Sequence, residues 1–260
     1  MKRVHLTSAV LVLGWAGGLS AAMIESFEYP DQAAFNAVWR PWSSNNTPML
    51  LASSPTHSGS GAVHGVALAN NTVRSARDLD SYTDYVGTDD SPIRFEFWLY
   101  DENPALPTLP NGARNFNEIR AYAGNGMPAT FSNTGLQGLI AMGLYNTPVS
   151  DDNYHARVYY GGVSAWFNLN TPRTAGWHKL TAEIGASAVR FLVDDQLDTV
   201  VAFVDPARVY AFDGVVLGSG LTSGGYDVFF DDLSVVKTPE PATLLVMAAA
   251  GLLTARRRRG

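Results

Sequence analysis

Residues 93–100 read Ile-Arg-Phe-Glu-Phe-Trp-Leu-Tyr, so that an apolar side chain stands at every second position. Successive side chains of a β-strand point to opposite faces of a sheet, and this period of two therefore predicts a half-buried strand. The side chains expected to face the core are Ile93, Phe95, Phe97 and Leu99. The opposite face would carry Arg94, Glu96, Trp98 and Tyr100.

Similar short runs recur along the chain. Residues 180–184 alternate in the same way, and residues 189–193 follow after a turn at 185–187, which predicts a hairpin. Short apolar runs at 215–217 and 226–230 are bounded by glycine, and residues 101–112 contain three prolines and predict a long loop. The expected helix spans residues 31–38, with Asp31 as its N-cap. This pattern predicts an all-β, two-sheet antiparallel sandwich.

Two stretches resemble known jelly rolls. Residues 177–180 read Trp-His-Lys-Leu, and residues 189–194 read Val-Arg-Phe-Leu-Val-Asp, which is similar to paired strands of the laminin-G and concanavalin-A-like jelly roll. In that family a glycine follows the Val-Asp pair, whereas this chain has Asp195. Residues 230–235 resemble the closing strand of exported jelly rolls and carbohydrate-binding modules, and residues 27–28 their opening strand. The resemblance implies a jelly roll over residues 23–237.

The C-terminal stretch, residues 238–260, has three parts. Pro239-Glu240-Pro241 is followed by an uncharged run at 242–255 and then by Arg256, Arg257, Arg258 and Arg259. As a helix the apolar run would reach about 21 Å at roughly 1.5 Å per residue, which is short for a lasting membrane span. The stretch resembles the PEP-CTERM sorting signal of Gram-negative bacteria, which implies recognition by an exosortase and transient membrane insertion. The alternatives are a plain C-terminal membrane helix and a core helix with a basic end.

The N-terminal stretch has the features of a signal peptide. Lys2 and Arg3 precede an apolar run at 10–19, and small residues at 20–22 offer a cleavage site before Met23. We therefore expect a signal helix at 1–22, with signal peptidase and the export machinery as partners. Together the two ends predict export to the cell surface or the extracellular matrix, after transient anchoring in the inner membrane.

Charge and cysteine content narrow the classes of function. The chain has no cysteine, which excludes a disulfide framework, a lipoprotein anchor and thiolate metal sites. All 24 acidic residues but only 12 of the 18 basic ones lie between residues 23 and 241, so this body carries a net charge of −12. Such a surface repels phosphate backbones, and nucleic-acid binding is not expected.

No catalytic motif is present. Jelly-roll glycosidases carry two carboxylates on one strand, in a pattern of the type Glu-x-Asp-x-x-Glu, and neither Glu96 nor Glu183 begins such a pattern. Nucleophile-elbow and zinc-helix motifs are also missing from the sequence, and His178 is interpreted as a structural strand residue. We therefore expect a protein that is not an enzyme. The alternative is a glycan hydrolase whose carboxylates meet only in the fold, with Glu96 and Glu118 as candidates.

The sequence does contain candidate residues for glycan binding. Sugar rings stack on aromatic faces beside hydrogen-bonding groups. The candidate glycan-binding face consists of Arg94, Glu96, Trp98, Tyr100, Arg157 and Tyr159, with His155 beside the last two. Alternatively, these residues pack under a loop or form cross-strand pairs that only stabilise the sheet.

The resemblance to calcium-stapled modules implies a structural calcium site. It would place Glu28 near Asp231 or Asp232, joining the first and last strands. The pairs Asp89-Asp90 and Asp151-Asp152 are alternatives, although aspartate is also common in solvated turns. The sequence thus predicts an exported, non-catalytic surface or matrix protein that binds glycans, with a hydrolase and a purely structural or adhesive protein as the alternatives.

Overall fold

The computed structural model describes residues 22–43, 46–65, 73–79, 84–102, 114–124, 126–145, 152–218 and 228–238. The expected signal helix, the sorting motif with its arginines, and nearly all of the expected 101–112 loop lie outside these residues. Within them, no helix is both long and apolar enough to cross a membrane.

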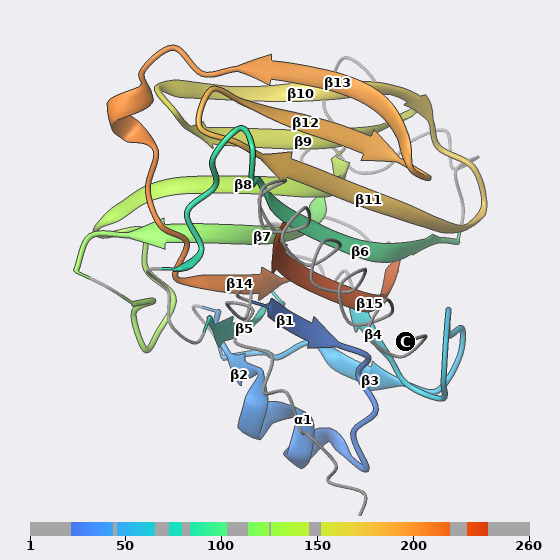
Figure 1. Ribbon diagram of the computed structural model, residues 1–260. Helices are drawn as coiled ribbons and strands as arrows, with labels where there is room; N and C mark the ends of the chain where they lie inside the picture. The colour runs from blue at the N-terminus through green and yellow to red at the C-terminus, as the bar shows by residue number, and fades with distance from the viewer. Residues whose placement is uncertain are drawn as a thin grey trace, which may run out of the picture. The chain divides into compact units, whose positions relative to one another are not determined.

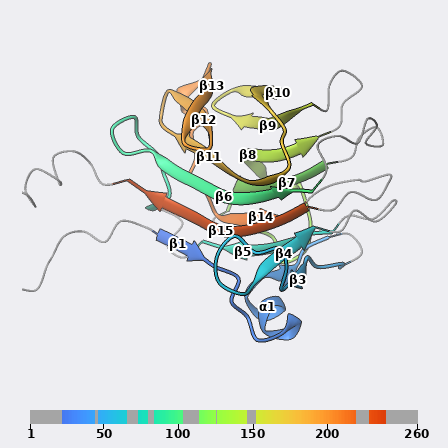
Figure 2. The same ribbon diagram turned by 90° about the vertical axis from the view of Figure 1, so that its right-hand side faces the viewer.

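The described residues form two antiparallel sheets, which confirms the all-β sandwich (Figures 1 and 2). The eight-stranded sheet runs in the order β13 (Gln196–Ala202), β12 (Ala188–Val193), β11 (Gly176–Ile184), β6 (Ile93–Asp101), β15 (Val228–Lys237), β4 (Ala62–Gly65) and β3 (Leu50–Ala52), with β1 (Ala22–Glu25) also paired to β15. The seven-stranded sheet runs in the order β10 (Val163–Pro172), β9 (Asn153–Tyr160), β8 (Leu136–Tyr145), β7 (Arg114–Tyr122), β14 (Gly214–Leu217), β5 (Ser75–Asp78) and β2 (Arg40–Pro41). Strands distant in sequence are therefore neighbours in both sheets, as in a jelly roll.

Strand β6 behaves as its alternation predicts. Ile93, Phe95, Phe97 and Leu99 are fully buried, while the side chains between them are only partly covered. The expected hairpin is also present, since β11 pairs with β12 in a register that places Ile184 opposite Val189. Both strands belong to the eight-stranded sheet, and β6 lies beside β11 within it.

The turn between β12 and β13 contains two aspartates where the resembling family has Asp-Gly. Asp194 and Asp195 both have positive φ, of 50° and 63°, which a two-residue type I′ hairpin turn requires. Aspartate tolerates this region because its short side chain forms local hydrogen bonds. The Asp194 carboxylate accepts from Lys179 N and contacts His178, and that of Asp195 forms an ion pair with Lys179 Nζ at 2.7 Å.

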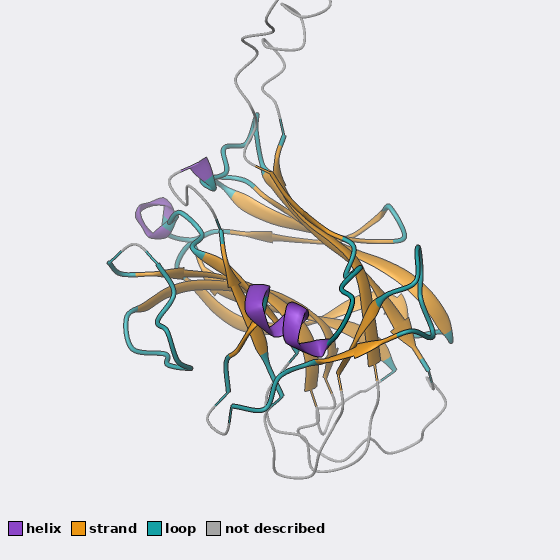
Figure 3. Cartoon of the chain, turned by 90° about the horizontal axis from the view of Figure 1, so that it is seen from below, coloured by secondary structure: helices purple, strands orange, loops and turns teal. Residues whose placement is uncertain are grey.

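The expected helix is present as α1 (Gln32–Val38), capped by Asp31, whose carboxylate accepts a hydrogen bond from Ala34 N at 2.8 Å. A single-turn 3₁₀ helix spans Pro206–Arg208. Figure 3 shows how little helix accompanies the strands.

The first and last strands pair as expected, but the opening strand lies earlier than predicted. Strand β1 pairs with β15 through Glu25 and Leu233 and ends before Phe27 and Glu28. Phe27 has φ of 56°, which an extended strand cannot accommodate. Its ring is fully buried against Phe35 and Trp39, so packing of α1 explains why the chain leaves the strand here.

Candidate functional site

The outer face of the seven-stranded sheet is built by the registers of β7 to β10. Trp166 of β10 is opposite Arg157 of β9, Arg157 is opposite Ala141 of β8, and Ala141 is opposite Glu118 of β7. Directly paired residues point to the same side of a sheet, so these four side chains form one row. A second row, two residues away along each strand, contains Ser164, Tyr159, Leu139 and Arg120.

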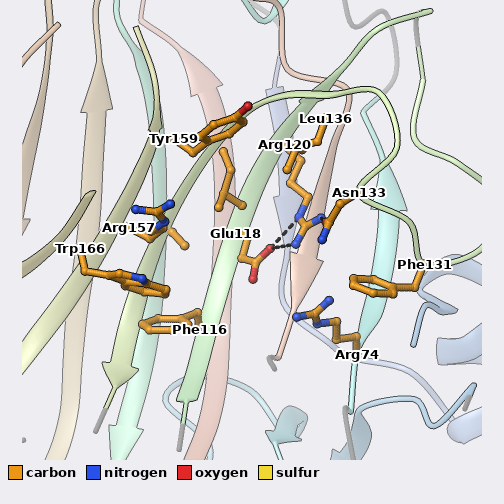
Figure 4. Close-up of a pocket in the computed structure, with 12 residues that line it drawn as sticks. Arg74, Phe116, Glu118, Arg120, Phe131, Asn133, Leu136, Arg157, Tyr159 and Trp166 are labelled. Carbon is orange, nitrogen blue, oxygen red and sulfur yellow. Dashed lines mark hydrogen bonds and ion pairs between the residues drawn. The ribbon is translucent and has the colours of Figure 1, made fainter. Parts of the chain in front are cut away.

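A groove of about 470 Å³ opens over these rows (Figure 4). Ala141 lies between Arg157 and Glu118, and its single methyl group leaves the centre of the row hollow. The described residues that line the groove are Arg74, Phe116, Glu118, Arg120, Phe131, Asn133, Leu136, Leu139, Ala141, Arg157, Tyr159 and Trp166. The volume lies within the range of small-ligand sites, roughly 300–1,000 Å³.

One wall of the groove is aromatic. Trp166 packs against Tyr145 and Phe116, with ring centroids 4.5 and 5.2 Å away. It remains 37% exposed, and Tyr159 is 39% exposed. Large aromatic rings held in place by neighbours, yet open to solvent, are suited to stacking on an apolar ligand face.

The opposite wall is a small second core formed by Trp42, Ala76, Tyr122, Met127 and Val216, with Phe131 and Leu136 packed against it. The indole of Trp42 and the hydroxyl of Tyr122 donate to the carbonyls of Pro128 and Ser132, which holds the segment 126–135 over this core. This segment supplies Phe131 and Asn133 to the groove.

Glu118 and Arg120 form a buried ion pair in the groove. Arg120 Nε and Nη2 lie 2.6 and 2.5 Å from Glu118 Oε2, and both residues are less than 10% exposed. Arg120 Nη1 also donates to Tyr122 Oη at 2.9 Å and to Asn133 Oδ1 at 3.1 Å. Burial alone would lower the pKa of Arg120, but attraction to Glu118 outweighs it and the pKa is raised. Arg120 is therefore a fixed cation.

Two more arginines reach the groove from other strands. The guanidinium of Arg74 lies 4.5 Å from the ring centre of Phe131, and that of Arg157 lies 5.2 Å from the ring centre of Trp166. Arg157 also donates to Ser164 Oγ at 3.1 Å. Among the described lining residues, Glu118 is the single carboxylate beside the three arginines Arg74, Arg120 and Arg157.

A second hollow of about 300 Å³ adjoins the first. It is lined in part by Gln137, Ser164, Arg208 and Tyr210, and it shares Leu136 and Tyr159 with the groove. Tyr159 thus stands between two adjacent hollows on one face of the seven-stranded sheet. The surface can therefore hold a ligand longer than a single ring.

The six residues of the predicted glycan-binding face lie on two different sheets. The prediction that they form a single face is therefore wrong. Arg157 and Tyr159 belong to the groove, with the buried His155 next to them on β9. Arg94, Glu96, Trp98 and Tyr100 lie instead on β6, in the eight-stranded sheet. The hydrophobic core separates the two faces, which the alternation within each strand could not reveal.

Side chains of the protein itself occupy the β6 face. Trp98 stacks on the imidazole of His57 with centroids 3.7 Å apart, and Tyr100 packs edge-on against Trp177. Arg94 forms ion pairs with Glu96, Glu183 and Asp195. Loop packing and cross-strand pairing, the alternative considered above, therefore describe this part of the surface.

The two carboxylates considered for hydrolysis do not meet. Glu96 is on the outer face of the eight-stranded sheet and pairs with Arg94, whereas Glu118 is in the groove of the other sheet. They cannot flank one glycosidic bond. His178 lies in β11, as interpreted, where it links two turns by contacts of 2.8 Å to Asp194 and Thr174.

The acidic residues considered for calcium organise the loop at 57–61 instead. Glu28 accepts from Ser60 N and Oγ and from Gly61 N, and the bonds from Ser60 lower its pKa. Asp231 accepts from the amides of His57 and Ser58, and burial raises its pKa. Asp232 contacts the side chains of the same two residues.

These carboxylates do not assemble a metal site in the part of the chain that the structure describes, where no group of three or more His, Asp or Glu side chains is placed to hold a metal ion. Of the alternatives, Asp89 caps the turn of the β11–β12 hairpin by accepting from Ala186 N and Ser187 N. Asp151 lies outside the described residues.

Most residues of the groove were not predicted from the sequence. Phe116, Glu118 and Arg120 alternate along β7, and this alternation was an available signal. Their meeting with Arg157 and Trp166 depends on the pairing order β7-β8-β9-β10. Arg74, Phe131 and Asn133 come from outside these strands and carry no pattern that marks them.

No family model and no curated protein matches this sequence. Among solved structures, a carbohydrate esterase of the Shiga toxin-encoding bacteriophage phi24B is similar with a TM-score of 0.50, at 13% identity, over 74% of this chain and 87% of that chain. The Crh5 transglycosylase in complex with NAG has a TM-score of 0.47 at 10% identity, covering 85% of each chain. Lectin UEA-II complexed with galactose has a TM-score of 0.45 at 12% identity, covering 84% of this chain and 98% of that one. At these identities such likenesses bear on the fold alone.

Proposed function

We propose that this chain is an exported, non-catalytic glycan-binding protein, and that glycans bind in the groove on the seven-stranded sheet. The observation that carries the proposal is the groove itself, in which exposed Trp166 and Tyr159 stand beside arginine and amide groups. Aromatic faces take the apolar face of a sugar ring, and donors from Asn133 and the arginines take its rim. The fold shared with a carbohydrate esterase agrees with a carbohydrate ligand.

A binding role is favoured over hydrolysis by the charges in the groove. Two-carboxylate hydrolysis needs an acid and a base on either side of the bond. Among the described lining residues Glu118 is the single carboxylate, and it is already paired with Arg120. A purely structural or adhesive protein needs no open groove. That alternative therefore does not explain why the rings of Trp166 and Tyr159 are exposed in the groove.

The place of action rests on the two ends of the sequence. A signal peptide at 1–22 and a PEP-CTERM-like stretch at 238–260 support export from a Gram-negative bacterium and processing by an exosortase. The proposed location and the groove together favour binding of polysaccharide at the cell surface or in the extracellular matrix.

A glycan array of the purified full chain tests the proposal. We expect Trp166→Ala to weaken binding by about 10- to 100-fold, that is by about 1.4–2.8 kcal/mol, because it removes the main stacking surface. Trp98→Ala serves as the matched control, since this tryptophan is on the other sheet under His57. Loss of binding with Trp98→Ala but not with Trp166→Ala would refute the assignment of the groove.

A further inference from the structure

We infer that the groove and the second hollow form one site, which binds several consecutive sugars of a polysaccharide chain that lies along the β9–β10 hairpin. This rests on the proposed function and adds to it the form of the ligand and its direction. The two hollows, of about 470 and 300 Å³, share the side chains of Tyr159 and Leu136 and are otherwise lined by different residues. A ligand that fills one hollow therefore reaches the border of the other.

The direction of the site follows from the pairing of β9 and β10. Trp166, in the groove, is opposite Arg157, whereas Ser164, in the second hollow, is opposite Tyr159. The path from the groove into the second hollow therefore runs along the two strands, toward their connecting turn at 161–162. A strand rises about 3.3 Å per residue, so the path from Trp166 to this turn is about 13 Å long. A single sugar ring cannot fill this length.

Two exposed aromatic rings stand along the path (Figure 4). Trp166 is 37% exposed and Tyr159 is 39% exposed. Tyr159 lies two residues beyond the direct partner of Trp166, so the two are diagonal neighbours on adjacent strands, about 7–8 Å apart. Each ring can take the apolar face of a different sugar. Tyr159, at the border, would contact the sugar that passes from one hollow into the other.

The outer wall of the second hollow is fixed to the hairpin. Arg208 and Tyr210 line this wall. Gly161 N donates to the carbonyl of Arg208 at 3.0 Å, and Tyr160 Oη accepts from Tyr210 N at 2.9 Å while donating to the Tyr210 carbonyl. The wall is therefore held to the end of β9 and to its turn through its own backbone. The hollow is preformed, as ligand sites usually are.

Both hollows carry neutral hydrogen-bonding side chains. Asn133 lines the groove, and Gln137 and Ser164 line the second hollow, and all three are exposed. Sugar hydroxyls both donate and accept, so amide and hydroxyl side chains can bond to them without any charge on the ligand. The border residues Tyr159 and Leu136 offer mainly apolar surface instead. Polar contacts at both ends of the path and stacking at its middle suit a run of linked sugars.

The experiment varies the length of the ligand. Binding of the full chain is measured by calorimetry to cello-, xylo- and manno-oligosaccharides of two to six sugars, and to the same lengths of the sugar that binds best on the array. We expect the affinity to rise at least about tenfold, or about 1.4 kcal/mol, between the disaccharide and the length that reaches both hollows. Beyond that length the affinity should level off, because further sugars lie outside the site.

A variant places the gain in the second hollow. Gln137→Trp puts a large ring into this hollow without altering a residue that lines the groove. We expect it to abolish the gain in affinity with length. The matched control is Gln196→Trp, the same change at an exposed position of β13 in the other sheet, which should keep the gain. An unfolding curve for each variant confirms that its fold is intact.

The outcomes separate the inference from the proposed function. Equal affinity for all lengths from two sugars to six would overturn the continuous site while keeping a glycan-binding groove. A gain with length that persists in the folded Gln137→Trp protein would also overturn it, because the chain would then lie in another direction. No binding of any oligosaccharide or array glycan would overturn both.

Discussion

Replacing Ala141 by phenylalanine is expected to abolish glycan binding, with a loss of at least about 100-fold, or about 2.8 kcal/mol. Ala141 forms the floor of the groove, between Arg157 and Glu118 in the row of paired residues. A phenyl ring at this position occupies the space in which a sugar ring would lie. The substitution alters none of the residues that would hydrogen-bond or stack on the ligand. Calorimetry with the array glycan that binds best measures the effect.

The matched control is Ala141→Ser, which adds one small polar atom and should keep affinity within about threefold, less than 0.7 kcal/mol. Phenylalanine is favourable in strands, so the Ala141→Phe protein is expected to fold. Its unfolding curve checks this point. If Ala141→Phe is folded and still binds with the affinity of the unmodified chain, the ligand lies elsewhere.

Replacing Asp101 by alanine is expected to reduce the free energy of unfolding by about 3–5 kcal/mol. Asp101, at the end of β6, accepts two hydrogen bonds from Arg173, at 2.7 and 3.0 Å, and their side chains are 0% and 3% exposed. Removing the Asp101 carboxylate breaks this buried ion pair and takes two hydrogen bonds from the buried guanidinium. Arg173 follows β10 of one sheet and precedes β11 of the other, so the ion pair joins the crossover between sheets to β6.

Urea denaturation measures this loss, which is a large part of the roughly 5–15 kcal/mol that stabilises a typical domain. The double variant Asp101→Leu with Arg173→Met is the control, because it removes both charges and should recover much of the stability. A loss below about 1 kcal/mol for Asp101→Ala would mean that solvent reaches the pair, as at a surface ion pair.

Elements with a strong local signal could be predicted from the sequence. The alternation in β6, the β11–β12 hairpin and the Asp31 cap of α1 each depend on neighbouring residues, and all three are present. The Phe27-Glu28 prediction missed because burial of the Phe27 ring under α1, a tertiary contact, ends the strand early.

The groove could be predicted only in fragments. Arg157, Tyr159 and Glu118 were identified, but the first two were grouped with β6, and Glu118 with Glu96, because strand alternation does not say to which sheet a strand belongs. The overall charge, likewise, does not show where charged side chains of one sign lie together. A net charge of −12 describes the body as a whole, whereas pairing of distant strands gathers three arginines in one place.

The most direct test of the groove is a titration followed by the indole N–H signals of the tryptophans in the ¹⁵N-labelled full chain. Trp166 lines the groove, whereas Trp98 and Trp177 lie together on the opposite sheet around His57. Adding the array glycan that binds best is expected to shift the Trp166 signal and to leave the signals of Trp98 and Trp177 in place. Movement of the Trp98 and Trp177 signals, with that of Trp166 unchanged, would contradict a glycan site on the seven-stranded sheet.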